Sequence, residues 1–197
     1  MKSVYNFVVT PIGERYNNVT KVGDKELILN TEIFNHQYVN RKAKVLSTPI
    51  IGDTNIEIDS EVIVHHNVFR RWHDMKGVER NSKSYFNEKT YIVNKDQIFL
   101  YKKANQWKSV DGFCWVQPIK NKDKYNISSE QENIGVVKYT DGTFNVDDLV
   151  GFTPISTYEF IIEGQRLYRV YTKFITIKYE YQGNEEEYNP SWAESSR

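Results

Sequence analysis

The stretch Ile58-Asp59-Ser60-Glu61-Val62-Ile63-Val64 says most about the fold, because the chain repeats it. It aligns without gaps on Val146-Asp147-Asp148-Leu149-Val150-Gly151-Phe152. In each copy an Asp-containing turn leads into a short run rich in β-branched or aromatic residues, which is typical of a buried strand. The two stretches together predict a divergent internal duplication.

Three more blocks recur in the same order around this pair. Val9-Thr10-Pro11-Ile12 matches Val116-Gln117-Pro118-Ile119, Ala43–Leu46 matches Gly135–Lys138, and Tyr91–Val93 with Ile98 matches Tyr168–Val170 with Ile175. In the first pair a Pro, which cannot donate to a ladder, closes the strand. The blocks divide the chain near residues 105–111 into halves of about 90–105 residues, each large enough for a small barrel.

The other apolar segments are short and lie between Gly, Asn, Asp and Pro residues, and none keeps the 3.6-residue apolar spacing of a helix. Asp141-Gly142 is a strong hairpin signal, because Gly readily adopts the positive φ of a tight turn. We therefore predict an all-β protein with two tandem small β-barrels, residues 1–106 and 107–181. Residues 182–197 are expected to form a flexible acidic tail, with docking of Tyr188 and Trp192 on a neighbour as the alternative.

The chain carries 26 basic and 26 acidic side chains and no net charge. A protein that binds nucleic acid through phosphate contacts usually has a basic excess, so no nucleic-acid partner is expected. The single cysteine, Cys114, excludes an internal disulfide and a zinc site built from several cysteines. No apolar run reaches the ~18–20 residues that cross a bilayer, and the first residues do not resemble a signal peptide. These features predict a soluble cytoplasmic protein without a membrane partner.

Few residues in the sequence suggest a catalytic or metal-binding site. His65-His66 and His73-Asp74 invite a metal interpretation, but adjacent His residues in a strand point to opposite faces, so no metal site is expected. Asp147-Asp148 fits a turn whose Asp bonds its own backbone, and Cys114, between two aromatic residues, fits a buried thiol. The sequence has no phosphate loop, dinucleotide fingerprint or nucleophile elbow. We predict no catalytic, cofactor-binding or metal-binding residues and no enzymatic activity.

The two halves differ in their loops. Between the first and second blocks the first half has 30 residues, 13–42, and the second has 15, 120–134. Between the last two blocks the first half has 26 residues and the second again has 15. Enlarged loops on a small barrel usually carry function or are disordered, so the first half is the candidate for partner binding.

The order of these blocks resembles the GroES family of co-chaperonins. In that family a first strand is followed by a long mobile loop, a Gly-x-Val strand, a Val-Gly-Asp-x-Val-x-Phe turn and strand, and a closing Ile-x-x-x-Asp-Ile segment. Here Gly135-Val136-Val137 resembles the Gly-x-Val strand, and Val146–Phe152 resembles the turn and strand, with Asp147 where Gly is usual. Asn94–Ile98 and Thr172–Ile175 resemble the closing segment. The resemblance covers roughly residues 4–180 as two copies.

The resemblance implies a gripping site. Family members insert an apolar tripeptide of the mobile loop into the apical domains of a GroEL-like chaperonin in its ATP-bound state. The matching loop, residues 13–42, contains Leu27, Ile28 and Leu29 as the chaperonin-binding tripeptide, with Lys25-Glu26 where the family often has Gly-Gly. Ile33-Phe34 is a second apolar candidate. The family also implies a homo-oligomeric ring, with a heptamer favoured, that caps the folding chamber and binds no nucleotide itself.

Many family members have a long hairpin that closes the roof of the ring. Here residues 47–55 and 139–143 form only short turns, so this hairpin is expected to be absent. In this respect the chain resembles divergent or phage-encoded members, whose compartment would be the host cytoplasm. Alternatives stay open. Leu27–Leu29 fits a core strand equally well by periodicity alone. A structural virion or tail protein built from the same barrels is the second function, and a ligand-binding or enzymatic barrel is the third. Because loop 13–42 carries four acidic and five basic residues, its grip is expected to depend only weakly on salt.

Overall fold

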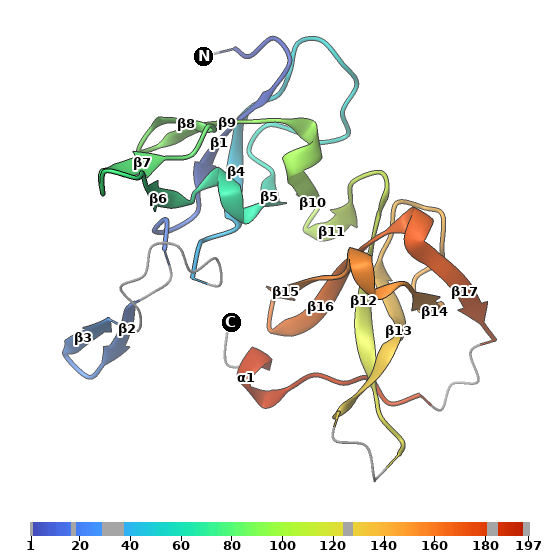
Figure 1. Ribbon diagram of the computed structural model, residues 1–197. Helices are drawn as coiled ribbons and strands as arrows, with labels where there is room; N and C mark the ends of the chain where they lie inside the picture. Colours follow the sequence, from blue (N-terminus) through green and yellow to red (C-terminus); the bar gives the residue numbers. More distant parts are fainter. Residues whose placement is uncertain (1, 17–18, 29–37, 124–127, 181–184, 195–197) are drawn as a thin grey trace. The chain divides into compact units, whose positions relative to one another are not determined.

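The computed structural model describes residues 2–16, 19–28, 38–123, 128–180 and 185–194. The chain folds into two compact units, Met1–Trp107 and Lys108–Arg197, which are described separately below (Figure 1). Strands dominate both units, and in the described ranges the single α-helix is the four-residue α1 (Ser191–Glu194). The all-β class predicted from the sequence is confirmed.

A seven-stranded antiparallel sheet forms the body of the first unit, in the order β11-β10-β5-β4-β1-β9-β8. Its strands are β1 (Phe7–Pro11), β4 (Lys42–Ser47), β5 (Glu61–Val64), β8 (Tyr85–Asn87), β9 (Thr90–Val93), β10 (Ile98–Lys103) and β11 (Gln106–Ser109). Along β4 burial alternates, with Ala43 and Val45 fully buried and their neighbours exposed. Such alternation gives the sheet one core face and one outer face.

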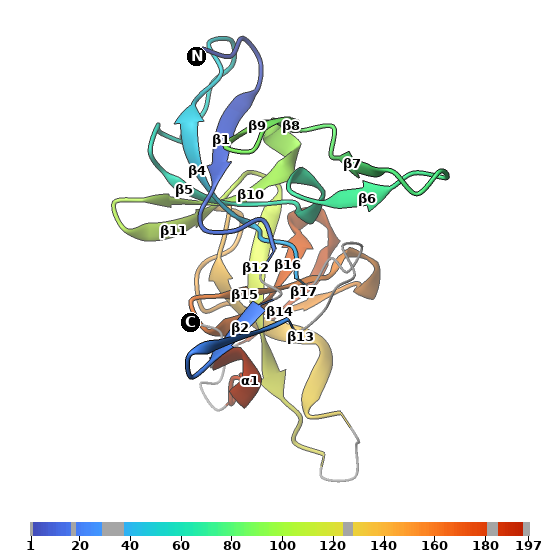
Figure 2. The same ribbon diagram turned by 90° about the vertical axis from the view of Figure 1, so that its left-hand side faces the viewer.

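A six-stranded antiparallel sheet forms the second unit, in the order β15-β16-β12-β13-β14-β17. Its strands are β12 (Phe113–Lys120), β13 (Glu130–Tyr139), β14 (Leu149–Phe152), β15 (Tyr158–Ile162), β16 (Gln165–Tyr171) and β17 (Ile175–Tyr179). Central β12 lies between β13 and β16 (Figure 2) and is buried over seven consecutive residues. The core gathers around Val116, Val137, Val150 and Val170, none of which is exposed.

The two sheets share one topology. Without β11, the order β10-β5-β4-β1-β9-β8 corresponds strand by strand to β17-β14-β13-β12-β16-β15. The register agrees as well, because residues aligned by the sequence blocks make equivalent pairs. These pairs are Val9–Val45 with Val116–Val137, Val9–Tyr91 with Val116–Tyr168, and Pro11–Ala43 with Pro118–Gly135. A single strand arrangement is therefore used twice in this chain.

The repeated Asp turn has the same geometry in both units. Asp59 has a φ of 67° and Asp147 a φ of 69°. The backbone N–H of Asp59 donates to Val45 O, and that of Asp147 donates to Val137 O, each over 2.8 Å. Asp tolerates this left-handed conformation better than most residues. This explains how Asp147 occupies the position that is Gly in the resembled motif.

The connections add small elements. The hairpin of β2 (Val19–Val22) with β3 (Lys25–Ile28) and the hairpin of β6 (Arg71–His73) with β7 (Glu79–Asn81) both belong to the first unit and lie in its two enlarged loops. In the described residues, 3-10 turns lie at His66–Val68, Lys95–Gln97, Pro154–Ser156 and Thr172–Phe174. Among the described strands, no ladder joins the edge strands of either large sheet, so each remains open where the sequence predicts a closed barrel.

The C-terminal segment 185–194 packs on the second unit, which differs from the flexible tail expected from the sequence. Glu187 bridges to Ile119, and the N–H of Tyr188 donates to Pro118 O over 2.8 Å. Asn189 accepts from the N–H of Arg166 and donates to Gly164 O, both over 3.0 Å. In α1, Ala193 is fully buried. Backbone pairing with β12 and burial of a small apolar residue together hold this acidic segment in place.

Candidate functional site

Loop 13–42 leaves the first unit through a hydrogen-bonded neck. The N–H of Ile12 donates to Lys42 O over 3.0 Å, and the N–H of Asn40 donates to Arg15 O over 2.9 Å. A further bridge joins Tyr16 to Val39. The pairing of β1 with β4 thus continues past the ends of both strands, and it fixes the direction in which the loop leaves the sheet.

Asn40 is the centre of this neck. Its side-chain amide donates to the carbonyls of Ile12 and Glu14, each over 2.8 Å. Its amide oxygen accepts from the N–H of Lys42, again over 2.8 Å. The residue is only 3% exposed. One buried amide therefore ties both chains of the neck together, a role that uses its donor and its acceptor at once.

Arg15 and Tyr16 connect the neck to the rest of the first unit. The guanidinium of Arg15 donates twice to Phe69 O, at 3.3 and 3.0 Å, and lies 5.5 Å from the ring centre of buried Tyr91. Burial raises the pKa of Tyr91 to about 12, so this ring stays neutral at physiological pH. The hydroxyl of Tyr16 accepts from the N–H of Arg71 over 2.7 Å. The neck is consequently anchored on two sides.

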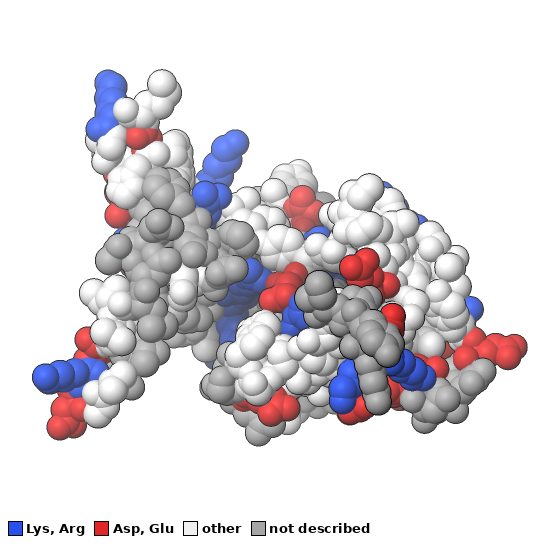
Figure 3. Space-filling view, turned by 60° about the horizontal axis from the view of Figure 1, so that its bottom comes forward, with Lys and Arg blue, Asp and Glu red and all other residues white. Residues whose placement is uncertain are grey.

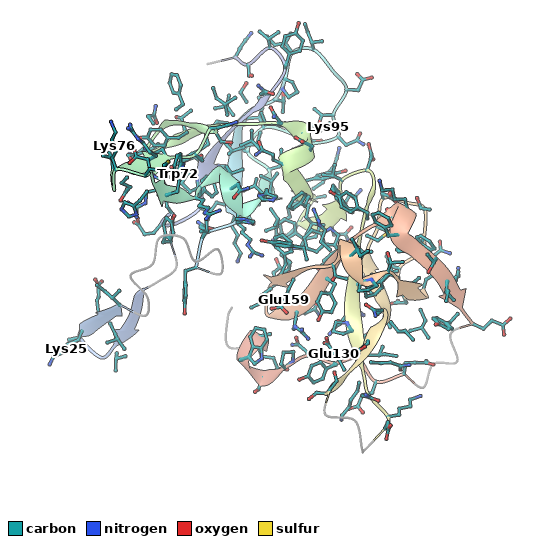
Figure 4. All side chains as sticks on the ribbon, viewed as in Figure 1. Lys25, Trp72, Lys76, Lys95, Glu130 and Glu159 are labelled. Carbon is teal, nitrogen blue, oxygen red and sulfur yellow. The ribbon has the colours of Figure 1, made fainter. Side chains whose placement is uncertain are left out.

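Beyond the neck, hairpin β2–β3 presents apolar side chains to solvent. Val22, Leu27 and Ile28 are 61%, 55% and 60% exposed. The turn between the strands consists of Gly23, at a φ of 63°, and Asp24, which matches a two-residue turn with Gly in its first position. The hairpin is a separate two-stranded sheet (Figure 1), and Lys25 marks its turn in Figure 4.

The tripeptide predicted from the sequence lies partly on this hairpin. Leu27 and Ile28 belong to β3, where all four side chains are exposed. They occupy a strand, as one alternative proposed, but they are not part of a core. Leu29 and the second candidate, Ile33-Phe34, lie outside the described residues. Successive strand residues face opposite ways, so Leu27 and Ile28 project from opposite faces of the hairpin.

Charge does not distinguish hairpin β2–β3. On the face shown in Figure 3, basic and acidic side chains are interspersed. The hairpin itself has both signs at neighbouring exposed positions, Lys25 and Glu26. Its apolar residues are thus its distinctive feature.

The residues considered for chemistry have structural partners. Nδ1 of His65 accepts from the N–H of Asn67 over 3.0 Å, and the ring centres of His65 and His66 lie 4.3 Å apart. The two rings do not point to opposite faces, because the strand ends before them and His66 begins a 3-10 turn. In the described part of the chain no set of three or more His, Cys, Asp or Glu side chains could hold a metal ion.

Cys114 is fully buried at the start of β12. Its sulfur lies 3.7 Å from the hydroxyl of Thr140 and 3.6 Å from that of Thr172. Burial raises the pKa of the Cys114 thiol, which keeps it protonated. Such a thiol is a poor nucleophile.

A cluster in the second unit was not foreseen from the sequence. Arg166 donates to Glu159 over 2.9 Å and also contacts Glu130, and both acids are labelled in Figure 4. The hydroxyl of Tyr168 accepts from Arg166 and donates to Glu130, both over 2.6 Å. Burial alone would lower the pKa of Arg166, but its bonds to the two acids raise it. Its members come from three strands, and no local pattern could have grouped them. Because they satisfy one another, the cluster is structural.

The other enlarged loop holds a second exposed hairpin. At β6–β7, Trp72, Met75 and Val78 are 44%, 105% and 48% exposed. Asp74 accepts from the N–H groups of Lys76 and Val78, each over 2.9 Å, and so closes the turn. The sequence signals for this hairpin were the length of the loop and its Asp and Gly residues. They indicated a turn but did not predict two paired strands.

Neither models of known protein families nor characterised proteins match the sequence. Across the described ranges, no helix is both long and apolar enough to span a bilayer.

Proposed function

We propose that the protein is a co-chaperonin that grips a GroEL-like chaperonin through hairpin β2–β3. The observation that carries this proposal is the exposed apolar pair Leu27 and Ile28 on a hairpin whose neck is clamped by Asn40. The block order shared with the GroES family supports it, and so does the use of one strand arrangement twice. Each unit is then a divergent GroES-like fold whose sheet is open, and the copies form a ring that caps the ATP-bound chaperonin.

The energetics favour many weak contacts. Leu27 and Ile28 are already about half covered, so docking buries the remainder and gives about 1–1.5 kcal/mol for each side chain. Holding the hairpin in one position on the partner offsets part of that gain, although the hydrogen-bonded neck already restricts where the hairpin can lie. A single hairpin would bind weakly. A ring that presents several copies at once raises the overall affinity by orders of magnitude without any new contact.

The hairpin also constrains the shape of the partner site. Because Leu27 and Ile28 project from opposite faces, a groove must clasp the ribbon along its edge to contact both. Exposed Lys25 and Glu26 neutralise each other, so the interaction relies on apolar contact.

The test is retention of the protein on an immobilised chaperonin with and without ATP. The test variant is the double substitution Leu27→Ser with Ile28→Ser. The control is Ile50→Ser with Ile51→Ser, which removes two similarly exposed apolar side chains from another loop of the same unit. Wild type and control should be retained only with ATP, and the test variant should lose at least tenfold in retention. Thermal unfolding should be unchanged in both variants, since exposed substitutions usually alter stability by less than about 0.5 kcal/mol.

Three outcomes contradict the proposal. Retention independent of ATP would indicate a different mode of binding. Equal retention of the test variant and wild type would remove the hairpin from the interface. If the control variant lost as much as the test variant, the capture would be general hydrophobic adsorption.

A further inference from the structure

A pocket of about 510 Å³ opens on the first unit beside hairpin β6–β7. Its lining combines two cations, Arg70 and Lys83, with the indole of Trp72, the amides of Asn67 and Gln97, and two serine hydroxyls. None of these residues belongs to loop 13–42. The volume falls in the range of about 300–1,000 Å³ that is common for small-molecule sites.

The β6–β7 hairpin explains why part of this lining lies together. Arg70 directly precedes β6 and Ser82 directly follows β7, and the ladder pairs their neighbours Arg71 and Asn81. Ser82 donates to Val68 O over 2.6 Å, which fixes this edge of the pocket. Trp72, labelled in Figure 4, keeps 44% of its surface exposed.

The cations of the pocket differ from Arg71 and Arg80 of the hairpin. Arg71 pairs with Glu79 and Arg80 with Asp74, each over 3.0 Å. Within the described residues neither Arg70 nor Lys83 has such a carboxylate partner, and no acidic side chain lines the pocket. The Nε of Arg70, like that of Arg71, is buried without a hydrogen-bond acceptor, so the difference between the two residues lies in the missing carboxylate partner.

We propose that this pocket binds a phosphate ester that carries a planar ring, of the nucleoside monophosphate class. A phosphate dianion matches two cations, and the planar fork of Arg70 suits its oxygens. The indole of Trp72 offers a flat apolar surface on which a ring can stack. The amide of Asn67 has a donor and an acceptor for polar atoms at the edge of such a ring, and the amide of Gln97 adds a donor, since its oxygen accepts from the N–H of Asn94 over 3.1 Å.

From the sequence we expect no bound nucleotide, because no motif places backbone N–H groups around a phosphate. The pocket uses side chains instead. These side chains come from hairpin β6–β7 and its flanking residues and from the 3-10 turns at His66–Val68 and Lys95–Gln97. Their spacing in the sequence matches no phosphate-binding motif. Binding here is independent of the hairpin that grips a chaperonin.

The test is isothermal titration calorimetry of the full chain with adenosine 5′-monophosphate at low ionic strength. Adenosine and inorganic phosphate are titrated separately, because each carries only one part of the ligand. The monophosphate should bind with a Kd below about 1 mM, and each part should bind at least tenfold more weakly. Its binding should quench tryptophan fluorescence in the wild type, and this quenching should be lost in Trp72→Phe.

Arg70→Lys keeps the charge but removes the fork and should weaken binding about fivefold or more, and Arg70→Ala should weaken it further. The matched control is Lys76→Ala, which removes an exposed lysine at the turn of the same hairpin, outside the pocket. It should bind as wild type does. Circular dichroism verifies that each variant is folded.

Absence of heat and of quenching at millimolar ligand would overturn the proposal. Equal affinities for phosphate and the monophosphate would show that the pocket does not recognise the ring, which contradicts the proposed ligand class. Equal losses in the Lys76 and Arg70 variants would reduce the interaction to general charge attraction.

Discussion

Asn40→Ala should loosen the neck of loop 13–42 and destabilise the first unit. The side chain makes three hydrogen bonds of 2.8 Å while only 3% exposed. Alanine leaves the carbonyls of Ile12 and Glu14 and the N–H of Lys42 without this partner. Little of the Asn40 surface is open to water, so solvent can replace these bonds only after the neck moves apart.

The magnitude follows from these bonds. A typical intramolecular hydrogen bond contributes about 1 kcal/mol, so three contribute about 3 kcal/mol. Freeing the side chain returns some conformational entropy, which leaves a loss of about 2–3 kcal/mol. In a unit of about 100 residues this corresponds to a fall in Tm of about 10–20 °C. The second unit does not contain the neck, so any separate transition of that unit should not change.

The assay is urea and thermal unfolding followed by circular dichroism. Asn87→Ala is the control, because Asn87 is exposed in the same unit and makes one hydrogen bond, from the N–H of Lys89 over 3.0 Å. Its loss should stay below about 0.5 kcal/mol. Asn40→Asp should also be destabilising, since a carboxylate cannot donate to the two carbonyls. A loss below about 1 kcal/mol in Asn40→Ala, or equal losses at both asparagines, would refute the role assigned to the neck.

Three further predictions concern the second unit. Gly135→Ala would put a Cβ well inside van der Waals contact of the carbonyl oxygen of Gln117, so the variant should lose about 2–3 kcal/mol in urea unfolding, although the equivalent residue of the first unit is Ala43. Unchanged stability would contradict this prediction. Burial alone would raise the pKa of Asp141, but its hydrogen bonds with Thr143, Thr172 and the N–H of Gly112 together lower it. The stabilisation by Asp141 is therefore present above its ordinary pKa of 3.8 and is lost as the pH falls, and Asp141→Asn should cost about 1–2 kcal/mol near pH 7 and markedly less near pH 3. Finally, Cys114, fully buried with a raised pKa, should react with a thiol reagent at least about a hundredfold more slowly in the native protein than in urea.

The part of the fold that could be read from the sequence is the part encoded locally. The aligned blocks anticipated equivalent strand pairs, for example Val9 with Val45 and Val116 with Val137. Local signals suffice there, because β-branched runs define the strands and an Asp turn such as that at Asp59 sets their connection. The sequence predicted closed barrels, but both large sheets are open. Whether a sheet closes depends on how its two edge strands approach each other in space, and a sequence pattern does not carry that information.

The features that were missed depend on contacts between distant residues. The acidic segment 185–194 looks like a solvated tail, yet its backbone pairs with Pro118 and Ile119 and its Ala193 is buried. The partners of Arg166 come from other strands. At the candidate site, the apolar residues of the hairpin were visible in the sequence, whereas the clamp by Asn40 was not, because an isolated asparagine in a loop carries no signal of burial.

The same strand end is covered differently in the two units. This difference supports different roles for the two units, binding for the first and structural support for the second. Ile12, which follows β1, and Ile119, near the end of β12, occupy equivalent positions in the aligned blocks. Ile119 is 3% exposed and packs with Val136 and Leu149, and segment 185–194 pairs with the backbone here, through the bridge from Glu187 and the bond from Tyr188 to Pro118. Ile12 is 38% exposed and leads directly into the neck of loop 13–42. The second unit closes this end with its own chain and keeps short loops, as a scaffold element would. The first unit instead carries both enlarged loops, with an exposed apolar hairpin on one and a cationic pocket beside the other, and these are the surfaces on which a partner and a ligand can act.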